Sequence, residues 1–185
     1  MSDLAATHPM LRALPAVAGG AALQPLPPAT RFILRGGTDV RATAAGAFGV
    51  EVPAHACRAS ERDERVALWL GPDEWLLIAP EAGATAAAAA LGSALEGLPH
   101  SLVDVSHRQT AFLVCGPQAA TLLAAGCPLD LDESAFPVDM CTRTLLAKAE
   151  IVLWRSAARA FHVEVSRSFA AYASLFLAEA ARGII

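Results

Sequence analysis

Short apolar segments separated by turn residues run along the chain from Phe32 onward. The segment that opens at Phe32 ends at a Gly-Gly pair and leads into an Ala-rich stretch, a pattern typical of a strand, a turn and a helix. Two further segments, "VALW" ending at Trp69 and "IVLW" ending at Trp154, are each followed by a short polar turn and another strand-like run. This spacing predicts two β-hairpins.

Helical patterns follow each predicted hairpin. The first is Ala-rich, lies within residues 81–96 and ends at a glycine. The second has Ser168 as the predicted N-cap and Gly183 after its last turn. Apolar side chains recur in it at helical spacing, namely Phe169, Tyr172, Phe176 and Ala180. Each half of the chain therefore reads as a βαββα unit.

The two halves also echo each other residue by residue. "FILRGGTDVRATAAGAFG" from Phe32 is answered by "FLVCGPQAATLLAAGCP" from Phe112, 80 residues later. Such self-similarity is the mark of a repeated structural unit. We expect an α+β fold of two pseudo-repeated, ferredoxin-like βαββα units, with the strand "SLVDVS" completing the first. The equivalent aromatic positions Trp69, Trp154 and Phe112 are expected in the core.

These patterns divide the chain into three parts. Residues 1–29 are rich in Pro and Ala without usable periodicity, and are expected to form an extended arm. Residues 30–106 are expected to form the first unit and residues 107–185 the second. The two units are expected to form one compact domain.

Composition narrows the range of partners. Hydrophobic residues make up 55% of the chain and the mean hydropathy is +0.43, which predicts apolar surface available to a protein partner. The net charge of −4 and the scattered Lys and Arg residues lack the basic surface that nucleic acids require. We therefore expect no nucleic-acid partner.

Neither a membrane span nor a secretion signal is expected. No stretch reaches the roughly 18 consecutive apolar residues of a membrane helix, and the start "MSDLAATHPM" lacks the charged and apolar regions of a signal peptide. The four cysteines include no CxxC pair and resemble small buried hydrophobes. These features predict a protein of the reducing cytoplasm.

One stretch, "VDVSHRQTAFLVCGP", has several polar side chains just before an apolar, strand-like run. Asp104 and Ser106 face one side of an extended strand and His107 faces the other, so a serine–histidine hydrogen bond is not expected. Asp104 and Arg108 also occupy the places where a nucleophile elbow requires glycine. We expect Asp104, Ser106, His107 and Arg108 to form a structural seam between the units, with short polar side chains bonding local backbone.

Two other polar segments are predicted to be turns. "GPDEW", with its adjacent carboxylates Asp73 and Glu74, has the composition of a hairpin turn. "RGGTD", residues 35–39, lacks the lysine of a phosphate-binding loop and the third glycine of a dinucleotide fingerprint. It is expected to be a tight strand-to-helix turn with Thr38 as N-cap.

Isolated histidines and cysteines do not predict a metal centre. His55 and Cys57 have the spacing of two ligands, but no second pair completes a four-ligand zinc site. His162, between two apolar strand residues, is expected to be a partnered or half-exposed strand residue. The residues by themselves therefore predict no catalytic, cofactor-binding or metal-binding site.

Two longer segments carry a resemblance to a known family. They are "VDVSHRQTAFLVCGPQAATLLAAGCPLDL" and "CTRTLLAKAEIVLWRSAARAFHVEVSRSFAAYASLFL". Together with "LWLGPDEWLLIAP", they resemble the gamma subunit of bacterial heterotetrameric sarcosine oxidase, from about Phe32 to the C-terminus. That family is similar to the folate-binding domain of glycine-cleavage aminomethyltransferases, in which a "DxSH" strand recurs.

The resemblance implies a non-catalytic member of an αβγδ complex, with the alpha, beta and delta subunits as partners. Aminomethyltransferases carry a Gly-Gly pair and paired aspartates where this chain has Ala147-Lys148-Ala149-Glu150. In the sarcosine oxidase family, FAD, FMN, NAD and zinc belong to the other subunits and tetrahydrofolate accepts the one-carbon unit, so no cofactor is expected on this chain. The alternatives are a free-standing folate-dependent aminomethyltransferase or one-carbon-binding protein, and a binder of another small molecule.

Overall fold

The computed structural model describes residues 20–184, which divide into two compact units. The contiguous unit runs from Pro28 to His107, and the split unit combines residues 20–27 with residues 108–184. Within residues 20–184, each unit holds a five-stranded antiparallel sheet and two α-helices. The fold is therefore α+β, as the apolar pattern predicts.

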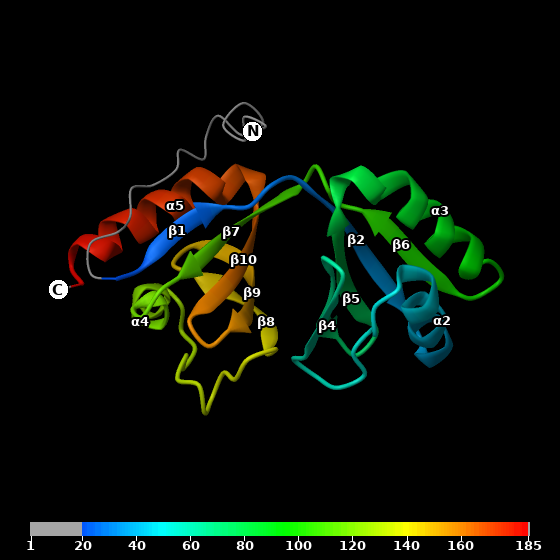
Figure 1. Cartoon of the computed structure of the whole chain (residues 1–185), viewed down its shortest axis with the longest axis horizontal. Coiled ribbons are helices and arrows are strands. Elements are labelled where there is room, and N and C mark those ends of the chain that lie inside the picture. Colours follow the sequence, from blue (N-terminus) through cyan, green and yellow to red (C-terminus); the bar gives the residue numbers. More distant parts are fainter. Residues whose placement is uncertain (1–19, 185) are drawn as a thin grey trace. The chain divides into compact units, whose positions relative to one another are not determined.

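The contiguous unit places both of its α-helices on one face of its sheet (Figure 1). The strand order is β3-β4-β5-β2-β6, and every neighbouring pair is antiparallel. Its elements are β2 (Ala29–Gly36), α2 (Thr38–Phe48), β3 (Ala59–Arg62), β4 (Arg65–Gly71), β5 (Glu74–Pro80), η1 (Glu81–Gly83), α3 (Ala84–Ala94) and β6 (His100–Asp104). Without β3, this is the order of a ferredoxin-like βαββαβ sheet.

The split unit has the same order of strands, but one strand comes from the other end of the chain. The order is β1-β7-β10-β9-β8. Its elements are β1 (Ala22–Pro25), β7 (Gln109–Cys115), α4 (Ala119–Ala124), β8 (Cys141–Leu146), β9 (Ala149–Ala157), β10 (Ala160–Ser166) and α5 (Arg167–Arg182). β1 thus takes the edge position beside β7 that β6 takes beside β2 (Figure 1).

β1 corrects the expectation that residues 1–29 form an arm outside the core. Leu23 pairs with Val114 of β7 and is 5% exposed, and the Leu26 N–H donates to the Ala111 carbonyl at 3.0 Å. The strand completes the sheet beside β7, whose backbone groups would otherwise be unpaired along that edge. The first 19 residues of the expected arm lie outside the described residues.

Both predicted turns are present. Gly36 ends β2 and α2 begins at Thr38, so Gly37, rather than Thr38, is the N-cap. A Cβ atom at Gly36 would lie 2.6 Å from the Val40 side chain, so only glycine allows this close approach. Between β4 and β5, Asp73 of the second turn forms an ion pair with Arg35 at 3.1 Å.

The three aromatic residues expected in the core occupy different environments. Phe112 is 1% exposed in the core of the split unit, and Trp69 is partly buried against the core of the contiguous unit. Trp154 is also buried, but it lies on the face of its sheet that carries no helix. Its neighbour Leu153 points into the core instead. The echo between "VALW" and "IVLW" is thus offset by one residue in the structure, and in a strand one residue reverses the face.

The last helix begins earlier than its sequence pattern predicts. α5 starts at Arg167 with Ser166 as its N-cap, and Gly183 follows its last residue. No helix of residues 20–184 is long and apolar enough to cross a membrane.

Candidate functional site

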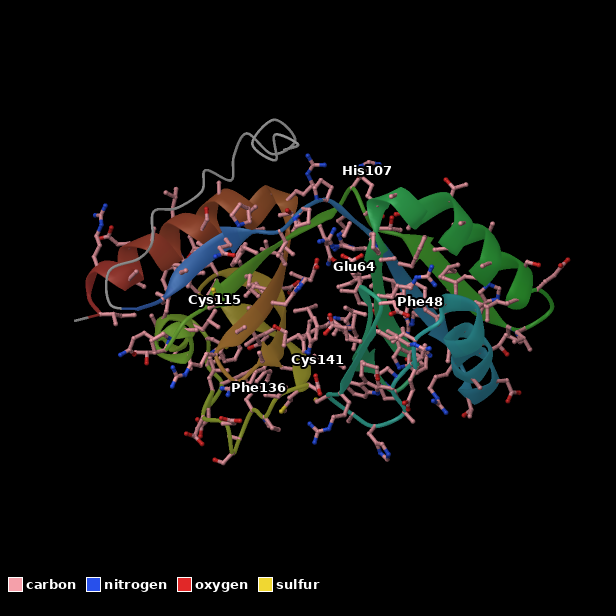
Figure 2. The ribbon with its side chains drawn as sticks, viewed as in Figure 1. Phe48, Glu64, His107, Cys115, Phe136 and Cys141 are labelled. Carbon is pink, nitrogen blue, oxygen red and sulfur yellow. The ribbon has the colours of Figure 1, made fainter. Side chains whose placement is uncertain are left out.

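The polar stretch between β6 and β7 is built around one carboxylate. Asp104 ends β6, and its Oδ1 accepts the backbone N–H of Ser106 at 2.8 Å and the hydroxyl of Ser106 at 2.6 Å. His107, the next residue, is exposed on the connector that leads to β7 (Figure 2). The side chain of Asp104 is therefore engaged in a local turn.

The Ser106 hydroxyl also continues the sheet of the contiguous unit. Its oxygen accepts the backbone N–H of Arg31 at 2.9 Å, while the N–H of Val105 donates to the Arg31 carbonyl at 2.8 Å. These bonds extend the pairing of β2 with β6 beyond the last paired residues, Phe32 and Asp104. Asp104 and Ser106 therefore secure the strand end on which the contiguous unit closes.

The same hydrogen bonds tune the acidity of Asp104. The Ser106 hydroxyl, followed by the Ser106 N–H, stabilises the ionised carboxylate and lowers the pKa of Asp104, and the nearby His107 acts in the same direction. Burial opposes this shift. Asp104 is consequently ionised at neutral pH and is a weaker proton acceptor than an ordinary carboxylate.

Arg108 has its backbone contact in the split unit. Its carbonyl accepts the N–H of Arg167, the first residue of α5, at 3.0 Å. The structure therefore brings Asp104 and Ser106 together as one hydrogen-bonded pair, whereas the backbone of Arg108 bonds to the first residue of α5.

A second pair with the same geometry lies in the split unit, where sequence reasoning missed it. The Oδ1 of Asp132 accepts the N–H of Ser134 at 2.9 Å and its hydroxyl at 2.6 Å. The hydroxyl is the larger cause of the lowered pKa of Asp132, as it is for Asp104. The shared signal is the spacing Asp-x-Ser, which could have been found in both halves.

A further polar cluster occupies the helix-free face of the split unit's sheet. His162 Nε2 lies 2.8 Å from Glu164 Oε1, with side chains 12% and 0% exposed. The His162 ring lies 5.7 Å from the Trp154 ring across the β9–β10 pair, and Cys141 follows in the same row on β8 (Figure 2). The carboxylate orients the imidazole, which confirms that His162 is a partnered strand residue.

This cluster contains one unsatisfied donor. The indole N–H of Trp154 is buried and has no hydrogen-bond partner among the described residues. Sequence reasoning missed Glu164 as the partner of His162, although residues two apart on a strand face the same side. The chemistry available here is that of a buried acid–base pair beside an aromatic ring.

Metal-binding geometry is absent from the described residues. Within residues 20–184 no three His, Cys, Asp or Glu side chains gather closely enough to hold one ion. His55 and Cys57 lie in the loop between α2 and β3, where Cys57 adopts a positive φ of 58°.

Comparison of the sequence with known proteins identifies relatives of one kind. A model of the sarcosine oxidase gamma subunit family matches residues 13–183. The gamma subunit of sarcosine oxidase from Arthrobacter sp. is 35% identical over 149 residues, which cover 79% of this chain and 72% of the relative. That from Corynebacterium sp. strain U-96 is 33% identical over 145 residues, which cover 78% and 70%.

Solved structures agree in fold. A chain of heterotetrameric sarcosine oxidase from Corynebacterium sp. U-96, in complex with pyrrole 2-carboxylate, matches with a TM-score of 0.85 and 30% identity, covering 98% of this chain and 92% of that one. The glycine cleavage aminomethyltransferase T of Bartonella henselae shares the fold, with a TM-score of 0.66 and 15% identity over 91% of this chain and 48% of its own. With its sequence matched from residue 13 to residue 183 and its fold shared over almost its whole length, this chain belongs to the sarcosine oxidase gamma subunit family.

Proposed function

We propose that this chain is a non-catalytic structural subunit of a heterotetrameric sarcosine oxidase, with alpha, beta and delta subunits as its partners. In this proposal the complex demethylates sarcosine oxidatively, tetrahydrofolate accepts the one-carbon unit, and FAD, FMN, NAD and zinc are held by the other subunits. Membership of the gamma subunit family and the likeness to a chain of a solved heterotetramer support it.

The observation that supports a non-catalytic role is the hydrogen bonding of Asp104 and Ser106. The hydroxyl that would have to act as a nucleophile donates to Asp104 and accepts from the Arg31 backbone. The carboxylate that would have to take its proton has a lowered pKa, which weakens it as a general base. Both side chains are thus engaged in closing a sheet.

We also infer that the two units are copies of one ferredoxin-like plan. Their sheets have the same order of strands once β1 is matched with β6, and the segments that begin at Phe32 and Phe112 form the equivalent strands β2 and β7.

Turnover of the assembled complex tests the absence of catalysis. Ser106→Ala and His107→Ala should leave sarcosine-dependent oxygen uptake, normalised to flavin, within a few-fold of the parent complex, because no transition-state contact is removed. A loss of about a hundredfold in either variant, with assembly unchanged, would show that the residue acts on the reaction.

Assembly and ligand binding separate the proposal from its alternative. The full chain, co-expressed with the other three subunits, should elute with them on a sizing column in equal amount. A monomer with no affinity for those subunits would contradict the proposal. Binding of tetrahydrofolate by the isolated chain would favour a folate-dependent one-carbon protein instead.

A further inference from the structure

Among the four strands that end the two sheets of residues 20–184, β6 is the most open (Figure 1). Four of its five residues are exposed, a larger share than in β1, β3 or β8. Edge strands carry unpaired backbone groups, and proteins commonly protect them with proline or with charged side chains, lysine above all. β1 has Pro25, β3 has Arg62 and β8 has Arg143, whereas β6, with the sequence "HSLVD", has no proline, lysine or arginine. β6 is therefore the edge that is best able to pair with another strand.

The hydrogen bonds of β2 show which side of β6 is free. The N–H of Val105, just beyond β6, donates to the Arg31 carbonyl at 2.8 Å, so the backbone groups of Val105 face β2. At the other end of the pair, Gly36 lies opposite His100, but its N–H donates to the Asp73 carbonyl at 3.0 Å instead. The backbone groups of His100 therefore face away from β2.

Alternation along β6 places its remaining backbone groups. Every second residue of an antiparallel strand bonds to the same neighbour. Ser101 and Val103 consequently face β2. The N–H and C=O groups of His100, Leu102 and Asp104 point to the free edge, where they can bond to a further strand.

We propose that β6 is the surface through which two copies of this chain associate, with β6 of one copy antiparallel to β6 of the other. A two-fold axis at Leu102 places this residue opposite its counterpart, and such a contact uses the same residues on both sides. In this register His100 lies opposite Asp104 of the second copy, so their outward backbone groups can exchange hydrogen bonds. The inference concerns the free chain and does not rest on the function proposed above.

The side chains of β6 favour a second copy in this antiparallel register. Residues directly opposite each other in paired strands share a face of the sheet, where opposite charges attract and like charges repel. The Ser106 hydroxyl lowers the pKa of Asp104, which is therefore ionised at neutral pH, and the residue opposite it is a histidine. A parallel pairing in register would instead bring the two Asp104 carboxylates together. The central Leu102 pair is apolar, and each leucine is already packed against the core of its own copy.

Sedimentation velocity of the purified full chain at rising concentration tests the proposal. Two five-residue strands make a small interface, so we expect a monomer at about 1 µM and a dimer at about 200 µM. His100→Pro removes one outward N–H from each copy, at the first residue of an edge strand, where proline is accepted. This variant should dimerise about tenfold more weakly or worse, because two hydrogen bonds are lost from each dimer.

The charge at position 100 tests the register. His100→Lys places a cation opposite Asp104 of the second copy, and His100→Asp places a like charge there. Both variants lose the contact of His100 Nδ1 with the Leu98 carbonyl at 2.8 Å, so their difference isolates the charge. We expect the lysine variant to dimerise about tenfold more tightly than the aspartate variant, since each dimer contains two such pairs. Leu145→Lys and Leu145→Asp, at an exposed leucine of the edge strand β8, are the matched controls and should dimerise equally well.

Other results would overturn the inference. A parent chain that stays monomeric at about 200 µM has no such self-association. Equal dimerisation of His100→Lys and His100→Asp would place the contact outside β6, as would loss of the dimer in Leu145→Lys. A monomeric parent whose His100→Pro variant is lost from the co-expressed αβγδ complex would assign β6 to another subunit. Thermal midpoints equal to that of the parent show that each variant is folded, and the two charge variants decide if His100→Pro does not fold.

Discussion

At the scale of single residues, two aspartate–serine pairs of this chain close local turns by hydrogen bonds. Asp104 and Ser106 do so in the contiguous unit, and Asp132 with Ser134 repeats their geometry in the split unit. In both pairs a carboxylate accepts two hydrogen bonds from a serine two residues later. At Asp104, this local bonding satisfies backbone groups where the β2–β6 ladder stops.

Asp104 links stability to pH. Because its pKa in the folded chain is lowered, its contribution is fully present above its ordinary value of 3.8 and is lost as the pH falls through the folded-state pKa. Asp104→Ala should lower the free energy of unfolding by about 1–2 kcal/mol at pH 7, toward the lower end of the roughly 1.5–3 kcal/mol of a hydrogen bond to a charged group, because Asp104 is exposed to solvent. Urea unfolding at several pH values measures the difference between parent and variant.

The control for this prediction is Asp104→Asn, whose amide oxygen still accepts from Ser106 without the charge. The gap between parent and Asp104→Ala should shrink as the pH falls below 3.8. A gap that stays constant into acid would mean that the ionised form of Asp104 contributes nothing.

Substitutions of Trp154 separate the contribution of its side-chain volume to stability from that of its indole N–H. Trp154→Ala should cost about 3–5 kcal/mol, because the side chain is 3% exposed and its removal leaves a cavity. Trp154→Phe keeps an aromatic ring and removes an indole N–H that has no partner among residues 20–184, so it should cost about 1 kcal/mol or less. Denaturant midpoints, compared where the unfolding free energies have the same dependence on denaturant, measure both losses. Equal losses in the two variants would show that the indole N–H is itself important.

At the scale of elements, the β1–β7 pair shows how a strand distant in sequence is seated. β1 enters the sheet at Gly20, whose carbonyl oxygen would lie 2.1 Å from a Cβ atom at Gly116. Gly116 also adopts a φ of +116°, which residues with a side chain avoid. The "GP" that ends the apolar run of β7 therefore leaves room for the incoming chain.

Gly116→Ala should destabilise the chain by more than about 1 kcal/mol, because the native backbone is incompatible with alanine and β1 must shift. Gly46→Ala is the matched control. It lies within α2 with open space around it, and alanine there should stabilise by about 0.5–1 kcal/mol. Thermal unfolding of both variants makes the comparison, and a gain in stability for Gly116→Ala would contradict the proposed seating of β1.

α5 illustrates a second property of elements, the choice of face. Its buried side consists mainly of small residues, with Ala170, Ala173 and Leu177 in the core. The larger residues Phe169 and Tyr172 lie outward. Small side chains on the buried side allow a helix to lie close to its sheet, whereas large ones would hold it away.

At the scale of the whole molecule, the order of the strands along the chain differs from their grouping into the two units. The first described strand, β1, belongs to the unit that contains the C-terminus, although the next strand, β2, starts only a few residues later in the other unit. The two units are therefore joined twice, before β2 and after β6.

This arrangement predicts that a destabilising substitution in β1 also destabilises the strands of the C-terminal half. Leu23→Ala should cost about 2–3 kcal/mol, near the lower end for a buried leucine because β1 is an edge strand. Native-state hydrogen exchange should show faster exchange of amides in β7 and β10, with β2 unchanged. Loss of protection in β2 but not in β7 would contradict the strand assignment.

The sequence by itself determined what depends on near neighbours. Apolar runs and turn residues predicted the β4–β5 and β9–β10 hairpins, the Gly36–Gly37 turn and the echo between the halves, because each depends on residues a few positions apart. The family resemblance followed from contiguous segments in the same way. The Asp104–Ser106 bond was also within reach, since both residues lie on one short turn.

Only the tertiary structure decided which partners lie far apart in the chain and which face of each element is covered. β1 is a strand because β7, some 90 residues later, offers a free edge, and nothing in "ALQP" indicates that edge. Trp154 lies away from the core because one residue of register reverses a strand's face, and Phe169 lies outward because smaller residues fit the sheet. Periodicity determines that a face exists, whereas packing against distant strands determines which face is buried.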